Sequence, residues 1–116
     1  MVARLSALLI AVLAAVLLPA ALAAGSGSST TIVVSFKEPA FHGTLKSNKS
    51  ACSTGRTVKL FREKSGPDTL LGTDTSNAKT KWSIPLGKRL TSGSYYAKAP
   101  AKGSCKPAKS KVLSIG

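Results

Sequence analysis

The chain has 116 residues and carries 17 lysines and arginines against four acidic residues, which gives a formal net charge of +13. This length suits one small domain. Four acidic residues leave little material for catalysis by paired carboxylates or for a metal site built from several oxygen ligands. The strong positive balance instead favours association with anionic partners.

The first 23 residues have the pattern of a secretory signal peptide. Arg4 supplies a positive start, residues 5–18 form an uncharged apolar run, Pro19 ends that run, and Ala21-Leu22-Ala23 offers a small-x-small cleavage site. We therefore predict a helical signal peptide over 1–23 and a secreted protein, either released or loosely associated with the cell wall. An uncleaved membrane anchor is the alternative, because the apolar run is nearly long enough to span a bilayer.

Removal of residues 1–23 leaves 93 residues and a net charge of +12. Residues 24–29 form a Gly/Ser-rich segment, which we predict to be a flexible linker. Residues 30–116 are then a single domain. A core built from so short a chain is marginal on buried area alone, so a covalent crosslink is expected.

Cys52 and Cys105 are the only cysteines and are the candidates for that crosslink. An even cysteine count in an exported chain predicts a structural disulfide. The loop it closes is worth roughly 4 kcal/mol by chain entropy. A metal pair or a reactive thiol is the alternative, but the sequence has no CxxC motif and His42 is its only histidine.

Short β-rich runs recur about every ten residues after the linker, and each is bounded by turn residues, which is typical of an antiparallel sandwich or barrel. No apolar stripe of helical period interrupts them. The predicted strands cover 30–36, 40–47, 57–62, 69–75, 80–84, 94–99 and 111–115. We predict an all-β, seven-stranded antiparallel Greek-key β-sandwich. Alternation places Trp82 in the core, Tyr96 outward, and Phe61 at an edge where it breaks the pattern.

Two local features refine this fold. Cys52 falls between the second and third predicted strands and Cys105 between the sixth and seventh, so the disulfide joins two loops at one end of the sandwich. The segment containing Leu90, Gly93 and Tyr95 predicts a tyrosine corner, in which the tyrosine hydroxyl bonds to the backbone a few residues upstream. The alternative is an ordinary strand tyrosine after a glycine turn.

The apolar and glycine spacing over roughly residues 40–100 resembles the prealbumin-like sandwich of carboxypeptidase regulatory-like and collagen-binding B-type domains. The segments that carry the resemblance are Phe41-x-Gly43-x-Leu45-x-Ser47, Val58-x-Leu60, Gly72-x-Asp74-Thr75, Trp82-x-Ile84 and Leu90-x-x-Gly93-x-Tyr95. Small secreted actinobacterial proteins share this pattern. The resemblance implies a structural or binding module with no catalytic residues. The strand order is prealbumin-like or immunoglobulin-like, since both use similar strand counts.

The chain departs from that family at two points. Residues 76–81 replace the family's compact Asp-Gly turn, and no acidic residue occupies a core-facing strand position suited to an isopeptide crosslink. Catalytic motifs are also weak, because His42 is predicted on an exposed face, and Asp68 and Asp74 are predicted to serve turns. We therefore predict no enzymatic activity, no cofactor and no bound metal.

Basic residues accumulate toward the C-terminal half, and no acidic residue follows Asp74. The candidate polyanion-binding residues are Lys79, Lys81, Lys88, Arg89, Lys98, Lys102, Lys106, Lys109 and Lys111. Lysines outnumber arginines by 13 to three after residue 23. Lysine acts as a point charge and lacks the bidentate fork of arginine, so the composition favours loose adhesion over specific phosphate recognition.

These observations predict a secreted, monomeric, non-catalytic structural or binding module that adheres weakly and salt-dependently to polyanionic polymers of the cell envelope or the extracellular space. The alternative is a domain that binds an unknown extracellular protein through the loops around the disulfide. A third possibility is that the basic surface only keeps the protein soluble. No small-molecule substrate follows from the sequence.

Overall fold

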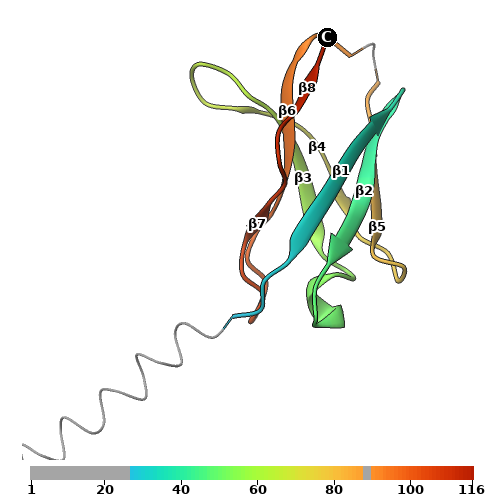
Figure 1. The fold of residues 1–116 in the computed structure, drawn as a ribbon, viewed down its shortest axis with the longest axis vertical. Helices are drawn as coiled ribbons and strands as arrows, with labels where there is room; N and C mark the ends of the chain where they lie inside the picture. The colour runs from blue at the N-terminus through green and yellow to red at the C-terminus, as the bar shows by residue number, and fades with distance from the viewer. Residues whose placement is uncertain (1–26, 88–89) are drawn as a thin grey trace, which may run out of the picture.

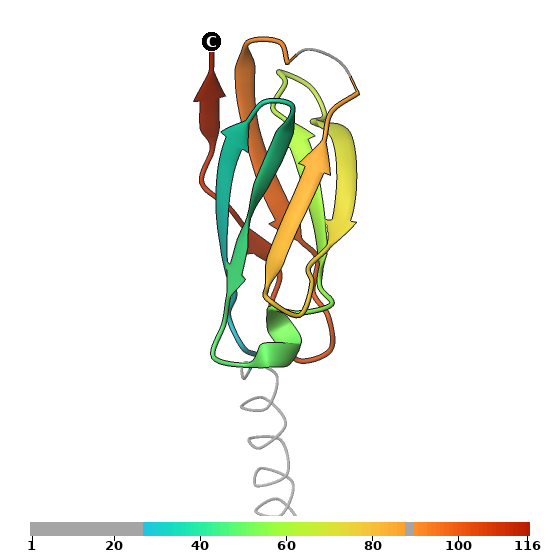
Figure 2. The same ribbon diagram turned by 90° about the vertical axis from the view of Figure 1, so that its right-hand side faces the viewer.

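The computed structural model describes residues 27–87 and 90–116 as two antiparallel β-sheets packed face to face (Figures 1 and 2). The predicted signal peptide at 1–23, residues 24–26 of the predicted linker, and the candidate residues Lys88 and Arg89 lie outside this description. Within the described residues, no helix is both long enough and apolar enough to cross a membrane.

The first sheet has the strand order β1-β2-β5 and the second has the order β4-β3-β6-β7, with β8 also pairing with β6. The strands are β1 (Thr31–Lys37), β2 (Ala40–Lys46), β3 (Thr57–Arg62), β4 (Thr69–Thr75), β5 (Lys81–Pro85), β6 (Gly93–Ala99), β7 (Ala108–Lys109) and β8 (Leu113–Ile115), with a short 3-10 helix, η1, at Ser50–Cys52. The all-β prediction is confirmed, and the first six predicted strands lie within one residue of their observed bounds.

The last predicted strand, at 111–115, is shorter than predicted, because only β8 (Leu113–Ile115) lies in that range, and an additional short strand, β7 (Ala108–Lys109), precedes it. Ser110 lies between β7 and β8, where its hydroxyl accepts a hydrogen bond from the Ala97 backbone N–H at 2.8 Å. The Ser110 N–H donates to the Ala97 carbonyl, also at 2.8 Å. The side chain thus takes the place of a backbone acceptor, and the ladder along β6 is divided into two parts.

Alternating side chains from both sheets fill the space between them, as the period of two predicts. The core residues of the first sheet are Ile32, Val34, Phe41, Leu45, Trp82 and Ile84, and those of the second are Val58, Leu60, Tyr95, Ala97 and Ala99. Gly43 permits the close approach of β1 and β2, since a Cβ atom at this position would overlap the Val33 carbonyl oxygen.

A β-bulge in β4 changes which side chains face the core. Leu60 pairs with Gly72 but Phe61 pairs with Leu70, so Leu71 is the extra residue and packs against the core. The prediction that Phe61 sits at an edge is wrong, because β3 lies between β4 and β6. Its ring points to the outer face and stacks on Tyr96, with centroids 5.5 Å apart.

Tyr96 points outward as predicted, but it is not exposed. Only 5% of its surface is accessible, because Phe61 stacks against the ring and the Lys109 ammonium lies 4.4 Å from the ring centroid. Tyr96 is therefore not free to stack on a ligand from solvent.

The predicted disulfide is present and joins η1 to the loop before β7, with the Cα atoms of Cys52 and Cys105 separated by 5.5 Å. The start of the described chain lies at the same end. Ser28 forms a parallel β-bridge with Cys105, and the Lys106 N–H donates to the Ser28 carbonyl at 2.8 Å. Ser28 thus belongs to the folded domain and not to the predicted flexible linker.

Arg56 is fully buried beside this disulfide and organises the surrounding loops. Its guanidinium donates to the Pro100 carbonyl through Nε and one terminal nitrogen, at 3.3 and 3.0 Å, and to the Lys106 carbonyl at 2.7 Å. The other terminal nitrogen donates to the Cys52 carbonyl and to the Thr30 hydroxyl, both at 3.0 Å. These five bonds use the full donor capacity of an arginine side chain.

The buried guanidinium has neutral partners only. Burial lowers the pKa of Arg56 from its ordinary value, but an arginine stays protonated at any physiological pH. The desolvation of this charge is offset by the five hydrogen bonds, which are stronger than bonds between neutral groups. Arg56 was not predicted to be buried, because charged residues usually lie on the surface.

The opposite end of the sandwich contains the tyrosine corner. The Tyr95 hydroxyl donates to the Thr91 carbonyl four residues upstream at 2.5 Å, so the predicted hydrogen bond is present. Leu90 packs against the edge of the core next to it. Gly93 opens β6, and the Arg62 side chain passes directly over it.

We expect Arg56→Met to lower the free energy of unfolding by about 3 kcal/mol, because it leaves the buried Cys52 carbonyl and the part-buried carbonyls of Pro100 and Lys106 without this donor. Arg56→Lys keeps the charge but not the planar fork, and should lose roughly 1–3 kcal/mol. Urea denaturation with the disulfide intact measures both. Arg62→Met is the matched control, since Arg62 is half-buried and, among the described residues, its side chain donates to the Ser92 carbonyl alone. An equal loss in the two methionine variants would contradict the role assigned to Arg56.

Candidate functional site

The nine candidate polyanion-binding residues do not form one patch. Lys88 and Arg89 lie outside the described residues, and the other seven are exposed. Lys79 and Lys81 belong to the turn before β5 and to β5 itself, in the first sheet. Lys102 and Lys106 lie in the disulfide loop. Lys98 and Lys109 lie on the second sheet, and Lys111 follows β7.

The two lysines of the disulfide loop are tied into the structure. The Lys102 ammonium donates to the Gly55 carbonyl at 2.8 Å, and the Lys106 carbonyl accepts a bond from Arg56. A shallow hollow beside them is lined by Lys59, Lys102 and Pro100, among others. This end of the molecule is basic, but Lys102 and Arg56 use their hydrogen-bond donors to stabilise the fold.

The outer face of the second sheet brings three lysines into one row. Lys59 on β3 pairs directly with Lys98 on β6, and Lys98 pairs directly with Lys109 on β7. We call these three residues the lysine row. Lys59 was not among the nine candidates. Lys59 lies opposite Lys98 because β3 pairs with β6. The two lysines are nearly forty residues apart in the chain, so this pairing could not be predicted from sequence spacing.

The row concentrates positive charge at an unfavourable spacing. Adjacent strands lie about 5 Å apart, and two unit charges at that distance repel by roughly 1 kcal/mol in water. Like charges directly opposite each other destabilise a sheet. An anion lying across the strands would relieve this repulsion, so the arrangement favours anion binding.

An aromatic pair lies next to the row and positions two of its lysines. Phe61 and Tyr96 stack with an angle of 17° between their rings. The Lys98 ammonium lies 5.8 Å from the Phe61 ring centroid, and the Lys109 ammonium lies over the Tyr96 ring. Such cation–π contacts are worth about 0.5–1 kcal/mol at exposed sites. They hold the two ammonium groups against the face of the sheet.

Asp68 marks one end of this face. Its carboxylate accepts a hydrogen bond from the Lys64 backbone N–H at 3.1 Å and another, short bond from the Tyr96 hydroxyl. The bond from Tyr96 is the main cause that lowers the pKa of Asp68, followed by the bond from Lys64, and the positive charges of Lys109 and Lys98 add to the effect. The same hydrogen bond, together with burial, raises the pKa of Tyr96 to about 12.

The first sheet carries lysines without such an arrangement. Lys37, Lys46 and Lys81 are exposed on β1, β2 and β5. Their paired neighbours across the strands are Ala40, Thr31 and Thr44, so no two of these lysines face each other. These three lysines of the first sheet therefore serve as a comparison for the lysine row: they carry the same charge, but they are not aligned across neighbouring strands.

His42 is exposed on the first sheet, opposite Ser83 in the ladder. The two residues line a shallow depression with Asp74, whose carboxylate accepts a hydrogen bond from the Ser83 backbone N–H at 2.7 Å. Asp74 thus caps an edge of β5 and does not orient the imidazole. Among residues 27–87 and 90–116, no three His, Cys, Asp or Glu residues gather closely enough to hold a metal ion.

We expect Asp68→Asn to lower the pKa of Tyr96 from about 12 toward the ordinary value of about 10. The raised pKa implies that wild-type stability falls as pH rises from about 10 to about 12. The lowered pKa of Asp68 implies a loss of stability as pH falls below its ordinary range.

The ultraviolet absorbance of tyrosinate, followed against pH, measures the Tyr96 transition. Tyr96→Phe serves as the control, because it should remove the transition that is assigned to Tyr96. An unchanged Tyr96 titration in Asp68→Asn would show that this hydrogen bond does not control the phenol.

Compared with known families and with curated proteins, the sequence matches no family model and no curated protein.

Proposed function

We propose that this chain is an exported, non-catalytic β-sandwich module that binds linear polyanions of the cell envelope through the lysine row. The observation that carries the proposal is the direct pairing of Lys59 with Lys98 and of Lys98 with Lys109. Three adjacent strands each contribute one lysine to the same face of the sheet. A flexible chain of phosphate or sulfate groups laid across the strands would contact all three.

The chemistry of the row supports loose binding. Lysine ammonium groups recognise charge and place few constraints on geometry, whereas arginine favours bidentate contacts. The aromatic rings beside the row are occupied by Lys98, Lys109 and each other. The proposed ligand is therefore recognised by its charge density, and its binding should weaken as salt rises.

Export is supported by the apolar leader at 1–23 and by the Cys52–Cys105 disulfide, since such bonds persist in oxidising compartments. We propose that the mature chain starts near Ala24 and acts as a monomer. It is released or held loosely at the cell wall. An electrostatic contact of this kind retains a protein at a charged surface without a covalent anchor.

We also propose that the sandwich is a Greek key of the immunoglobulin-like kind and not the prealbumin-like kind that its sequence resembles. The sheet order β1-β2-β5 against β4-β3-β6-β7 supports this assignment, because the fourth strand joins the sheet of the third and sixth strands, as in variable-type immunoglobulin domains. The tyrosine corner near the start of the sixth strand is a second feature of that fold.

We expect replacement of the lysine row by glutamine (Lys59→Gln, Lys98→Gln, Lys109→Gln) to weaken binding of a linear polyphosphate and to flatten its salt dependence. Each lost phosphate contact reduces the slope of log affinity against log salt by roughly 0.7 for a flexible chain, so three contacts reduce it by about 2. Titration of the mature chain, residues 24–116, over a series of salt concentrations measures this slope. Co-sedimentation with isolated cell envelopes tests the same variants on the natural surface.

The matched control replaces three lysines of the first sheet (Lys37→Gln, Lys46→Gln, Lys81→Gln), which changes the net charge by the same amount. We expect this variant to lose much less of the slope. Equal losses would mean that net charge alone drives binding. Envelope binding that ignores salt would instead favour a partner protein at the loops around the disulfide.

A further inference from the structure

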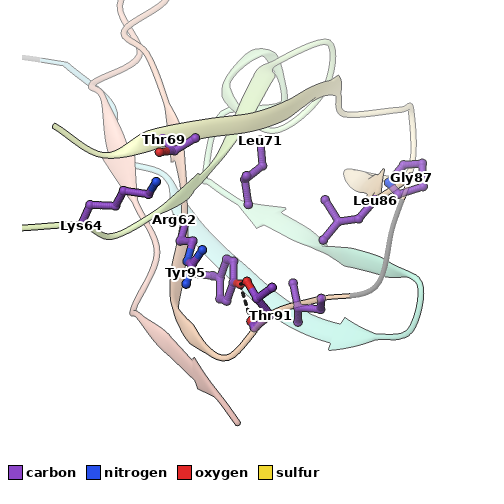
Figure 3. A pocket seen from close by; sticks show the side chains of 10 residues that line it. Arg62, Lys64, Thr69, Leu71, Leu86, Gly87, Thr91 and Tyr95 are labelled. Carbon is purple, nitrogen blue, oxygen red and sulfur yellow. Dashed lines mark hydrogen bonds between the residues drawn. The ribbon is translucent and has the colours of Figure 1, made fainter.

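A partly enclosed cavity of about 420 Å³ opens between the sheets at the end opposite the disulfide. Leu71 on β4 and Leu86 and Leu90 after β5 form its apolar part, as Figure 3 shows for Leu71 and Leu86. The tyrosine corner closes one side, with the Tyr95–Thr91 hydrogen bond at the wall. Its volume falls within the range of small-molecule sites in proteins.

The β-bulge of β4 creates much of this apolar lining. Without the extra residue, strand alternation would turn Leu71 to the outer face, where Leu70 is 49% exposed. The bulge turns Leu71 inward. Bulges are enriched next to functional sites because they redirect a side chain in this way.

Arg62 supplies a positive group at the edge of the apolar lining. Its side chain lies next to Tyr95 (Figure 3) and is half-exposed. One terminal nitrogen donates to the Ser92 carbonyl at 3.0 Å, and the guanidinium has five N–H donors in all. Lys64 adds a second cation to the lining, and Thr69 adds a hydroxyl. The described lining contains no carboxylate.

We infer that this cavity binds an amphiphile with an aliphatic chain and a single carboxylate, such as a medium-chain fatty acid. The chain would lie against Leu71, Leu86 and Leu90, and the carboxylate would accept hydrogen bonds from the Arg62 guanidinium. A planar guanidinium and a carboxylate match in geometry and charge. This inference is independent of the proposed polyanion binding, because the cavity and the lysine row share no residue.

The test is titration of the mature chain, residues 24–116, with dodecanoate and with dodecan-1-ol at monomeric concentrations, followed by two-dimensional amide NMR. We expect saturable dodecanoate binding with the largest shifts at Leu71, Leu86 and Tyr95, and binding of dodecan-1-ol about tenfold weaker or more. Equal affinities, absence of saturable binding, or shifts located elsewhere would overturn the inference. This comparison needs no variant.

A variant then tests Arg62 itself. Arg62→Gln should weaken dodecanoate about tenfold and leave dodecan-1-ol unchanged, since the glutamine amide still reaches toward the Ser92 carbonyl without the charge. Lys81→Gln is the control for the loss of one charge and should change neither ligand. The triple glutamine variant of the lysine row should keep full dodecanoate affinity. Undiminished dodecanoate binding by folded Arg62→Gln would overturn the role of Arg62.

Discussion

The buried guanidinium of Arg56 is the constraint on which the rest of this structure depends. A charge removed from water is tolerated only when nearly every donor finds an acceptor, and here five hydrogen bonds meet that requirement. The acceptors come from the start of the described chain, η1 and the loop between β6 and β7. These segments are far apart in sequence, and a core of eleven mostly aliphatic residues does not itself hold them. The Cys52–Cys105 disulfide closes the same region covalently.

The same guanidinium fixes the strands that carry the lysine row. Arg56 immediately precedes β3, the Pro100 carbonyl immediately follows β6, and the Lys106 carbonyl lies just before β7. Lys59, Lys98 and Lys109 lie within three residues of these fixed points. The hydrogen bonds that stabilise the disulfide end therefore also set the mutual register of three repelling charges. The Arg56 side chain, although it faces the interior, thus contributes both to stability and to the geometry of the proposed binding surface.

The burial of side chains that follow local strand alternation could be predicted from the sequence. Features that depend on pairing between distant segments could not. Trp82 and Tyr95 occupy the core because a period of two assigns them there. The burial of Tyr96 could not be predicted, because Lys109 covers it from a two-residue strand with no recognisable pattern. The bulge at Leu71 has no sequence signal either. The sequence does contain one signal for Arg56. It is one of only three arginines among 16 basic residues after the leader, and arginine is the cation best suited to burial.

Binding of polyanions along the lysine row is tested most directly by amide chemical-shift mapping of the mature chain with linear polyphosphate at low salt. We predict that the largest shifts occur at Lys59, Lys98 and Lys109, that they spread along β3, β6 and β7, and that they disappear as salt is raised. Shifts distributed evenly over both sheets, or largest around Lys46 and Lys81 on the first sheet, would contradict it.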